Sequence, residues 1–270
     1  MSKKSTNGQT EKNDNNIKTT TVKNDFKIMM REALPAAREV LEQRRKDLSK
    51  EGWNDDKQKE FYKIMGVEGN VKITHRYKVC NDEGRQYKME EDESTVIEFM
   101  RKSVDRMIVI CDNLCVEDEG IPSPQYDESG NPTNEVVLKY GNFVNKTYSG
   151  GYSAYVNSNL TWNKKPDEYK QNLEINIGHN FIGKKLFGDN SKASTLCHEI
   201  SHFVRFGYIG DGDKGRFGGV GTDDLPNDKD HKKDGTYITY ANKLVENHDL
   251  EVFQNAYNFE RYFQITKIGG

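Results

Sequence analysis

Residues 198–202 of this chain read HEISH, a segment that restricts both the local structure and the chemistry of the chain. It lies in a run from Ala193 to Phe206 that contains neither proline nor glycine, so the run can form a helix. In a helix, His198 and His202 project from nearly the same face, one turn apart, as two imidazoles must to share one metal ion. Glu199 lies beside them, where a carboxylate can take a proton from water and pass it to a leaving amine. The segment therefore predicts a helix that carries a zinc peptidase site.

The pattern H-E-x-x-H is uncommon by chance. The chain has 6 histidines in 270 residues, and a chain of this composition shows the pattern by accident in roughly one case in a hundred. We therefore interpret the pattern as a metal-binding and catalytic motif. The other histidines have no such spacing, and we assign no metal to His75, His179, His231 and His248.

A catalytic zinc needs a third protein ligand, and the sequence offers more than one candidate. The longer pattern H-E-x-x-H-x-x-G-x-x-H fails, because Arg205 stands at its glycine and Tyr208 at its third histidine. Glu246 lies in a later segment that is compatible with a helix. Asp224, in the segment GTDD of residues 221–224, is the candidate that we favour.

The segments HEISHF and GTDD together resemble those of the aspzincin metallopeptidases, the deuterolysin and peptidyl-Lys metalloendopeptidase type. The resemblance extends over residues 26–263 and is strongest from Leu173 onward, where the chain reads NLEINIGHNFIGKKLFGDNSKASTLCHEISHF and later ENHDLEVFQNAYNFERYF. It implies a zincin-like α+β fold and one catalytic zinc ion held by His198, His202 and Asp224. It also implies a zinc endopeptidase that hydrolyses peptide bonds with Glu199 as general base.

The chain departs from the family pattern in two places. Residues 206–220 form an insert with six glycines, which predicts a flexible loop near the site. The tyrosine that follows the GTxD segment in the family is missing, so Tyr237 or Tyr240 is expected to take its place as donor to the oxyanion, and we favour Tyr237.

The resemblance also bears on which substrates the chain accepts. The family's acidic pair for a substrate lysine aligns with Tyr257 and Glu260, so only one carboxylate remains. We expect both residues to bind substrate, with a blurred preference for basic or large residues C-terminal to the cut.

Composition excludes several other classes of function. The net charge is −3, the pI is about 6.1 and the mean hydropathy is −0.92, which gives no broad electrostatic reason to bind nucleic acid or an anionic membrane. The longest apolar run, residues 107–111, is much shorter than the roughly 20 residues needed to cross a bilayer. We expect a monomer whose partners are protein or peptide substrates.

The chain divides into a leader and one domain. Residues 1–25 are polar and predict a disordered leader, and residues 26–270 predict a single metallopeptidase domain with a helical part at about 26–118 and a catalytic part at about 135–265. Helices are expected at residues 26–48, 55–65 and 96–115. Strands are expected at 136–140, 152–156 and 173–177, the last as a sheet edge to which an extended substrate could add.

Two matters stay open at this stage. An inactive or structural zinc-binding homologue, acting as an interaction module or toxin component, is the alternative to an enzyme. The leader has no apolar core typical of a signal peptide, whereas the resemblance implies secretion. Export without a signal and a cytoplasmic location are the two alternatives.

Overall fold

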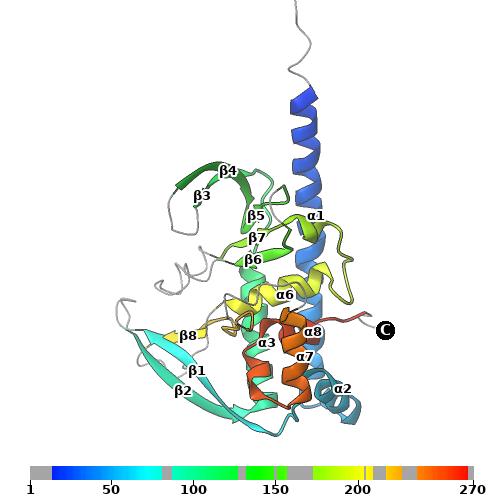
Figure 1. Cartoon of the computed structure of the whole chain (residues 1–270), viewed down its shortest axis with the longest axis vertical. Coiled ribbons are helices and arrows are strands. Elements are labelled where there is room, and N and C mark those ends of the chain that lie inside the picture. The colour runs from blue at the N-terminus through cyan, green and yellow to red at the C-terminus, as the bar shows by residue number, and fades with distance from the viewer. Residues whose placement is uncertain are drawn as a thin grey trace, which may run out of the picture.

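The structure, a computed structural model, describes residues 14–80, 87–126, 132–148, 151–156, 173–203, 205–208, 217–226 and 236–266. It is a mixed structure of helices and two small sheets, which confirms the α+β class (Figure 1). The helices are α1 (Asp14–Asp47), α2 (Asp55–Met65), α3 (Val96–Asn113), α5 (His179–Ile182), α6 (Lys192–His202), α7 (Thr236–Glu246) and α8 (Ala256–Tyr262), with a 3-10 helix η3 (Leu250–Phe253). No described helix is long and apolar enough to cross a membrane.

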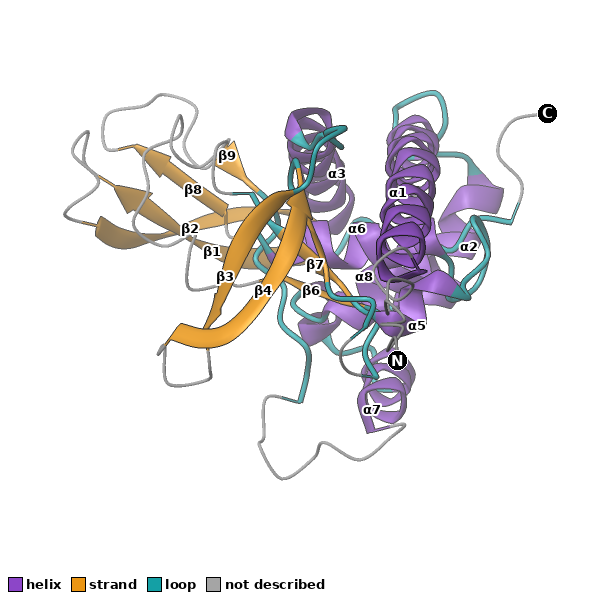
Figure 2. Cartoon of the chain, turned by 90° about the horizontal axis from the view of Figure 1, so that it is seen from above, coloured by secondary structure: helices purple, strands orange, loops and turns teal. Residues whose placement is uncertain are grey.

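The described strands form two sheets. One sheet has the order β2-β1-β8-β9 and the other the order β3-β4-β5-β7-β6. Their bounds are β1 (Lys72–Cys80), β2 (Tyr87–Thr95), β3 (Ile121–Tyr126), β4 (Pro132–Tyr140), β5 (Phe143–Asn145), β6 (Ala154–Val156), β7 (Ile175–Ile177), β8 (Arg205–Tyr208) and β9 (Phe217–Gly218). Figure 2 shows the strands gathered on one side of the molecule and most helices on the other.

Helix α1 begins earlier than the sequence analysis expected. It starts at Asp14, so residues 14–25 of the expected disordered leader are helical, and residues 1–13 lie outside the described part of the chain. Residues 14–34 contain no glycine or proline, so nothing in the sequence stops the helix from extending. Pro35 lies inside the helix.

Helix α2 has the expected ends, whereas α3 begins at the expected residue and ends at Asn113, two residues before the expected end. Helix α2 is capped by the Asn54 side chain and ends at Gly66, which has a positive φ of 73°. Helix α3 starts with a capping box, in which the side chains of Thr95 and Glu98 each accept a hydrogen bond from the other's backbone amide.

Strands β8 and β9 correct the prediction for the insert of residues 206–220. Residues 205–208 pair in parallel with β1 and antiparallel with β9, so both ends of the insert belong to a sheet, and residues 209–216 are outside the described chain. Glycine is tolerated here because sheet pairing uses backbone groups. The β1–β2 hairpin was not predicted, since the acidic residues at positions 90–93 are of types depleted in strands.

Strand β7 also differs from its prediction. It lies between β5 and β6, so it is not an edge strand, and all three of its residues are buried. Alternation of residue types indicates a strand but does not place it within a sheet. Within the described residues, the last strand on that side is β6.

Helix α6, which carries the HEISH segment, runs through the centre of the molecule. It contacts α1, α3, α8 and β6, and its residues from Ala193 to Ser201 are all buried. Packing against these elements therefore fixes the position of helix α6 in the core.

The buried side chain of Arg44 joins α1, α2 and α8. Its guanidinium donates to the Tyr262 carbonyl, pairs with Asp47 at 3.0 Å and Glu60 at 2.7 Å, and lies 4.3 Å from the centre of the Tyr262 ring. Because α8 also lies against α6, Arg44 helps to set the position of α8 beside the HEISH segment.

We predict that Arg44→Met lowers the free energy of unfolding by about 3 kcal/mol, because it leaves the buried Asp47 without its closest cation. Urea denaturation followed by circular dichroism measures this. Arg45→Met is the matched control, since Arg45 is 53% exposed and its pairs with Glu42 and Asp105 lie at the surface; its loss should stay under about 1 kcal/mol. Equal losses in the two variants would contradict the role of Arg44.

Candidate metal centre

The start of helix α6 is fixed by a reciprocal cap. The Ser191 hydroxyl accepts from the Ser194 amide and the Ser194 hydroxyl accepts from the Ser191 amide, both at 3.1 Å. From this start, the helix places His198 and His202 one turn apart, with ring centroids 4.8 Å apart and ring planes at 81°. The sequence prediction of a helix here is confirmed, although it ends at His202 and not at residue 206.

The loop that carries Asp224 is hydrogen-bonded to the end of α6. The amides of Gly221 and Thr222 donate to the Ser201 carbonyl at 2.9 and 3.1 Å, and the Ser201 and Thr222 hydroxyls lie 2.6 Å apart. Gly221 has φ of 79°, a left-handed backbone that favours glycine. This loop therefore follows the last turn of α6 closely.

Asp223 and Asp224 face different ways. The Asp223 amide donates to the Gln254 carbonyl at 2.8 Å and its carbonyl accepts from the Ala256 amide at 2.9 Å, so its backbone is paired with the chain that leads into α8. Asp223 itself is exposed, whereas Asp224 turns towards the histidines. The backbone pairing of Asp223 thus orients its neighbour.

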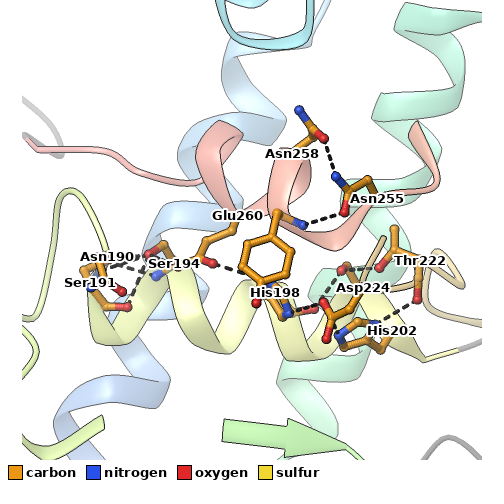
Figure 3. Close-up of polar contacts among 12 residues, drawn as sticks. Asn190, Ser191, Ser194, His198, His202, Thr222, Asp224, Asn255, Asn258 and Glu260 are labelled. Atoms are coloured by element: carbon orange, nitrogen blue, oxygen red, sulfur yellow. Dashed lines mark hydrogen bonds and ion pairs between the residues drawn. The ribbon is translucent and has the colours of Figure 1, made fainter. Parts of the chain in front are cut away.

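His198, His202 and Asp224 form a group that could hold a metal ion (Figure 3). The Asp224 Oδ1 atom lies 3.1 Å from Nε2 of His198 and 3.6 Å from Nε2 of His202. Ligands about 2.0–2.1 Å from a tetrahedral ion are about 3.3–3.4 Å apart, so these spacings fit. Asp224 Oδ1 is buried without a hydrogen-bond partner, although the side chain as a whole is 44% exposed. A cation would satisfy this oxygen.

The other third-ligand candidate is not part of this group. Glu246 lies at the end of α7 and is exposed. Within the described residues, His198, His202 and Asp224 are the group of three found with this geometry.

The second ring nitrogens of the two histidines have different partners. His202 Nδ1 lies 2.8 Å from the Thr222 carbonyl, and His198 Nδ1 lies 3.4 Å from Glu260 Oε2. Glu260 is on α8, and its Oε1 accepts from the Ser194 hydroxyl at 3.4 Å. The structure therefore places the Glu260 carboxylate beside His198 Nδ1, the ring nitrogen that does not face Asp224.

Glu199 is buried next to the ligands. Its Oε2 atom has no hydrogen-bond partner, while the backbone of Val156 in β6 donates to its carboxylate. Burial raises the pKa of Glu199 to about 8, against the opposing effect of His198. A carboxyl group with a raised pKa is a better proton acceptor, as a general base requires.

The pKa values of the two histidines are shifted in opposite directions. Burial favours a neutral His198, but the nearby carboxylates of Asp224 at 3.1 Å and Glu260 at 3.4 Å outweigh it, and the pKa of His198 lies well above the ordinary value. Burial and the charge of His198 lower the pKa of His202 to about 4. One imidazole therefore holds a proton among three carboxylates, in a place suited to a cation.

Aromatic rings cover one side of the group. The Tyr257 ring lies edge-on to His198 with centroids 5.0 Å apart, and Tyr237 stacks on Tyr257 at 5.2 Å with planes 10° apart. The Tyr240 hydroxyl instead donates to Glu251 at 2.6 Å. Of the two tyrosines that the sequence offered, Tyr237 is thus the one in contact with this aromatic cover.

Sequence reasoning missed residues that hold the ligands in place. Thr222 supplies the carbonyl for His202, and Asn255 caps α8 while its side chain lies 3.5 Å from the Leu225 amide. Asn255 had a sequence signal, because asparagine before a short helix is a typical N-cap. The role of a backbone carbonyl has no such signal.

We predict that, without metal, the Glu199→Gln variant becomes more stable than wild type by a margin that grows as pH rises. The pKa of Glu199 is about 8 in the folded chain and about 4.3 in an unfolded one. Because the folded pKa is higher, the stability contributed by protonated Glu199 is complete below about pH 4.3 and is lost as pH rises through about 8. Glutamine cannot ionise, so the difference in free energy of unfolding should grow from about pH 5 to about pH 8. Urea titrations of chelator-treated protein measure it, and a difference independent of pH would contradict the raised pKa.

Comparison of the chain with protein-family models, with curated proteins and with solved structures found no match. The resemblance to aspzincins therefore stays an expectation from the sequence. What the geometry adds is that these two segments, which residues 203–220 separate in the sequence, meet in one group that could hold a metal ion.

Proposed function

We propose that this chain is a zinc-dependent endopeptidase of the aspzincin type, with a zincin-like fold. The observation that carries the proposal is that Asp224 Oδ1 faces Nε2 of both His198 and His202, while the buried Glu199 lies next to them. Two imidazoles, one carboxylate and an adjacent glutamate are the parts that hydrolysis by a zinc peptidase requires.

His198, His202 and Asp224 are the residues that would hold the ion. When bound, zinc supplies Lewis acidity, which polarises a peptide carbonyl and makes a coordinated water more acidic. Neutral imidazole nitrogen and carboxylate oxygen are ordinary zinc ligands. Three carboxylates, those of Glu199, Asp224 and Glu260, act electrostatically on His198, and their charge favours a cation at this place.

Glu199 is the proposed general base. Its free Oε2 takes a proton from the water that attacks the carbonyl carbon, and it returns this proton to the leaving nitrogen as the C–N bond breaks. The products are a carboxylic acid and an amine, and no covalent bond to the enzyme forms. The hydrogen bond from Val156 holds the other end of the carboxylate.

The proposed substrate lies alongside β6. This strand contacts α6, and Val156 contacts Glu199 directly, so an extended peptide that follows β6 passes the general base. Tyr237 is the proposed oxyanion donor, since the Tyr240 hydroxyl is engaged by Glu251. The stacked Tyr237 and Tyr257 rings offer an aromatic surface for a large or basic substrate side chain.

A catalytic site is favoured over a structural zinc site by the number of ligands. Structural zinc sites in proteins have four protein ligands, whereas catalytic sites have three and leave one position for water. In the part of the chain that the structure describes, the group contains three potential ligands. The buried, unpartnered oxygen of Glu199 has no function in a structural site.

We predict that Asp224→Ala loses zinc and casein cleavage together, because Asp224 is the proposed third ligand. Zinc content of purified protein, measured by mass spectrometry of the metal, should fall from about one ion per chain to a small fraction, and cleavage by at least about a hundredfold. Asp223→Ala is the matched control, since Asp223 is exposed and takes part through its backbone. Loss of zinc in Asp223→Ala with retention in Asp224→Ala would overturn the assignment.

A further inference from the structure

Glu260 makes contacts that a substrate-binding residue would not need. Its Oε2 lies 3.4 Å from His198 Nδ1 and its Oε1 accepts from the Ser194 hydroxyl at 3.4 Å. Ser194 and His198 are four positions apart on α6, so the carboxylate bridges two residues on one face of that helix (Figure 3). The side chain of Glu260 is only 14% exposed.

The position of the ring proton in a metal-binding imidazole gives a reason for this contact. If His198 binds an ion through Nε2, its ring proton must reside on Nδ1, and a buried N–H needs an acceptor. In the described structure His198 Nδ1 is buried and its nearest charged partner is the Glu260 carboxylate. For His202 the Thr222 carbonyl already serves this purpose. A carboxylate is the stronger acceptor, and it makes the imidazole a better ligand.

We propose that Glu260 is a positioning residue that holds His198 in the tautomer and orientation required for metal binding, and that it does not select the substrate side chain. This inference rests on the proposed function. Both carboxylate oxygens have partners within the chain, and the half-buried Lys184 adds a further attractive charge, so little remains for a substrate ammonium. Helix α8 thus contacts the ligand His198 at two points, through Glu260 and through the edge-on ring of Tyr257.

Two substitutions separate positioning from substrate binding. Glu260→Met keeps the length of the side chain and removes the acceptor, whereas Glu260→Gln removes the charge but keeps an oxygen that can accept from Nδ1–H. We expect Glu260→Met to raise the zinc Kd about 10- to 100-fold, measured by competition with a chelating dye, and Glu260→Gln to raise it less than about tenfold. Glu246→Gln, at an exposed glutamate of α7, is the control and should leave the Kd unchanged.

Cleavage is measured on two peptides that differ by lysine or leucine after the cut. We expect kcat to fall in Glu260→Met, with KM unchanged, and the ratio of cleavage of the two peptides to equal that of wild type in both variants. An unchanged zinc Kd in Glu260→Met, or loss of a lysine preference in Glu260→Gln, would overturn the inference. If Glu260→Met does not fold, the peptide ratio of Glu260→Gln decides. Failure of wild type to bind zinc would instead reject the proposed function, and this inference with it.

Discussion

The hydrogen bonds between the last turn of α6 and residues 221–222 are the interaction on which the candidate site depends. Helix geometry by itself brings together His198 and His202, but it cannot bring a residue that lies 22 positions after His202. The Ser201 carbonyl accepts from two successive amides of the loop, and the Thr222 carbonyl in turn faces His202 Nδ1. The same short stretch thus orients the His202 imidazole and brings the Asp224 carboxylate next to it.

Helix α8 completes this arrangement from the other side. The chain leading into it pairs with the backbone of Asp223, its cap Asn255 is fully buried, and Glu260 reaches His198. Arg44 links α8 back to α1 and α2. The residues around the site therefore belong to separate parts of the chain. Packing of the whole core brings them together.

Burial disfavours the charged forms of two groups at this point, because it raises the pKa of Glu199 to about 8 and lowers that of His202 to about 4. Glu199, Asp224 and Glu260 lie near two buried imidazoles, and their negative charge raises the pKa of His198. Burial of charge is expensive, whereas a bound ion converts that cost into binding free energy that favours the folded state. We therefore expect metal binding and stability to be coupled in this protein.

Local structure near the motifs could be predicted from sequence, and tertiary placement could not. The helix around HEISH, the caps at Asn54 and Thr95 and the C-cap at Gly66 follow from residue types at fixed offsets. The nearness of Asp224 to the histidines was expected from resemblance to a family, and the structure brings the three together. The interior position of β7, the β1–β2 hairpin and the contact of Glu260 with His198 depend on long-range packing, for which a single sequence carries no periodic signal.

Glu199 is proposed to act as the base at a zinc ion held by its neighbours, and the Glu199→Gln variant separates that role from zinc binding. Zinc content and peptide cleavage are measured together for wild type and Glu199→Gln, each with and without a chelator. We expect Glu199→Gln to keep about one zinc per chain, while cleavage falls by about 10²- to 10⁴-fold. Cleavage equal to that of wild type in the zinc-loaded variant would show that Glu199 is not the base.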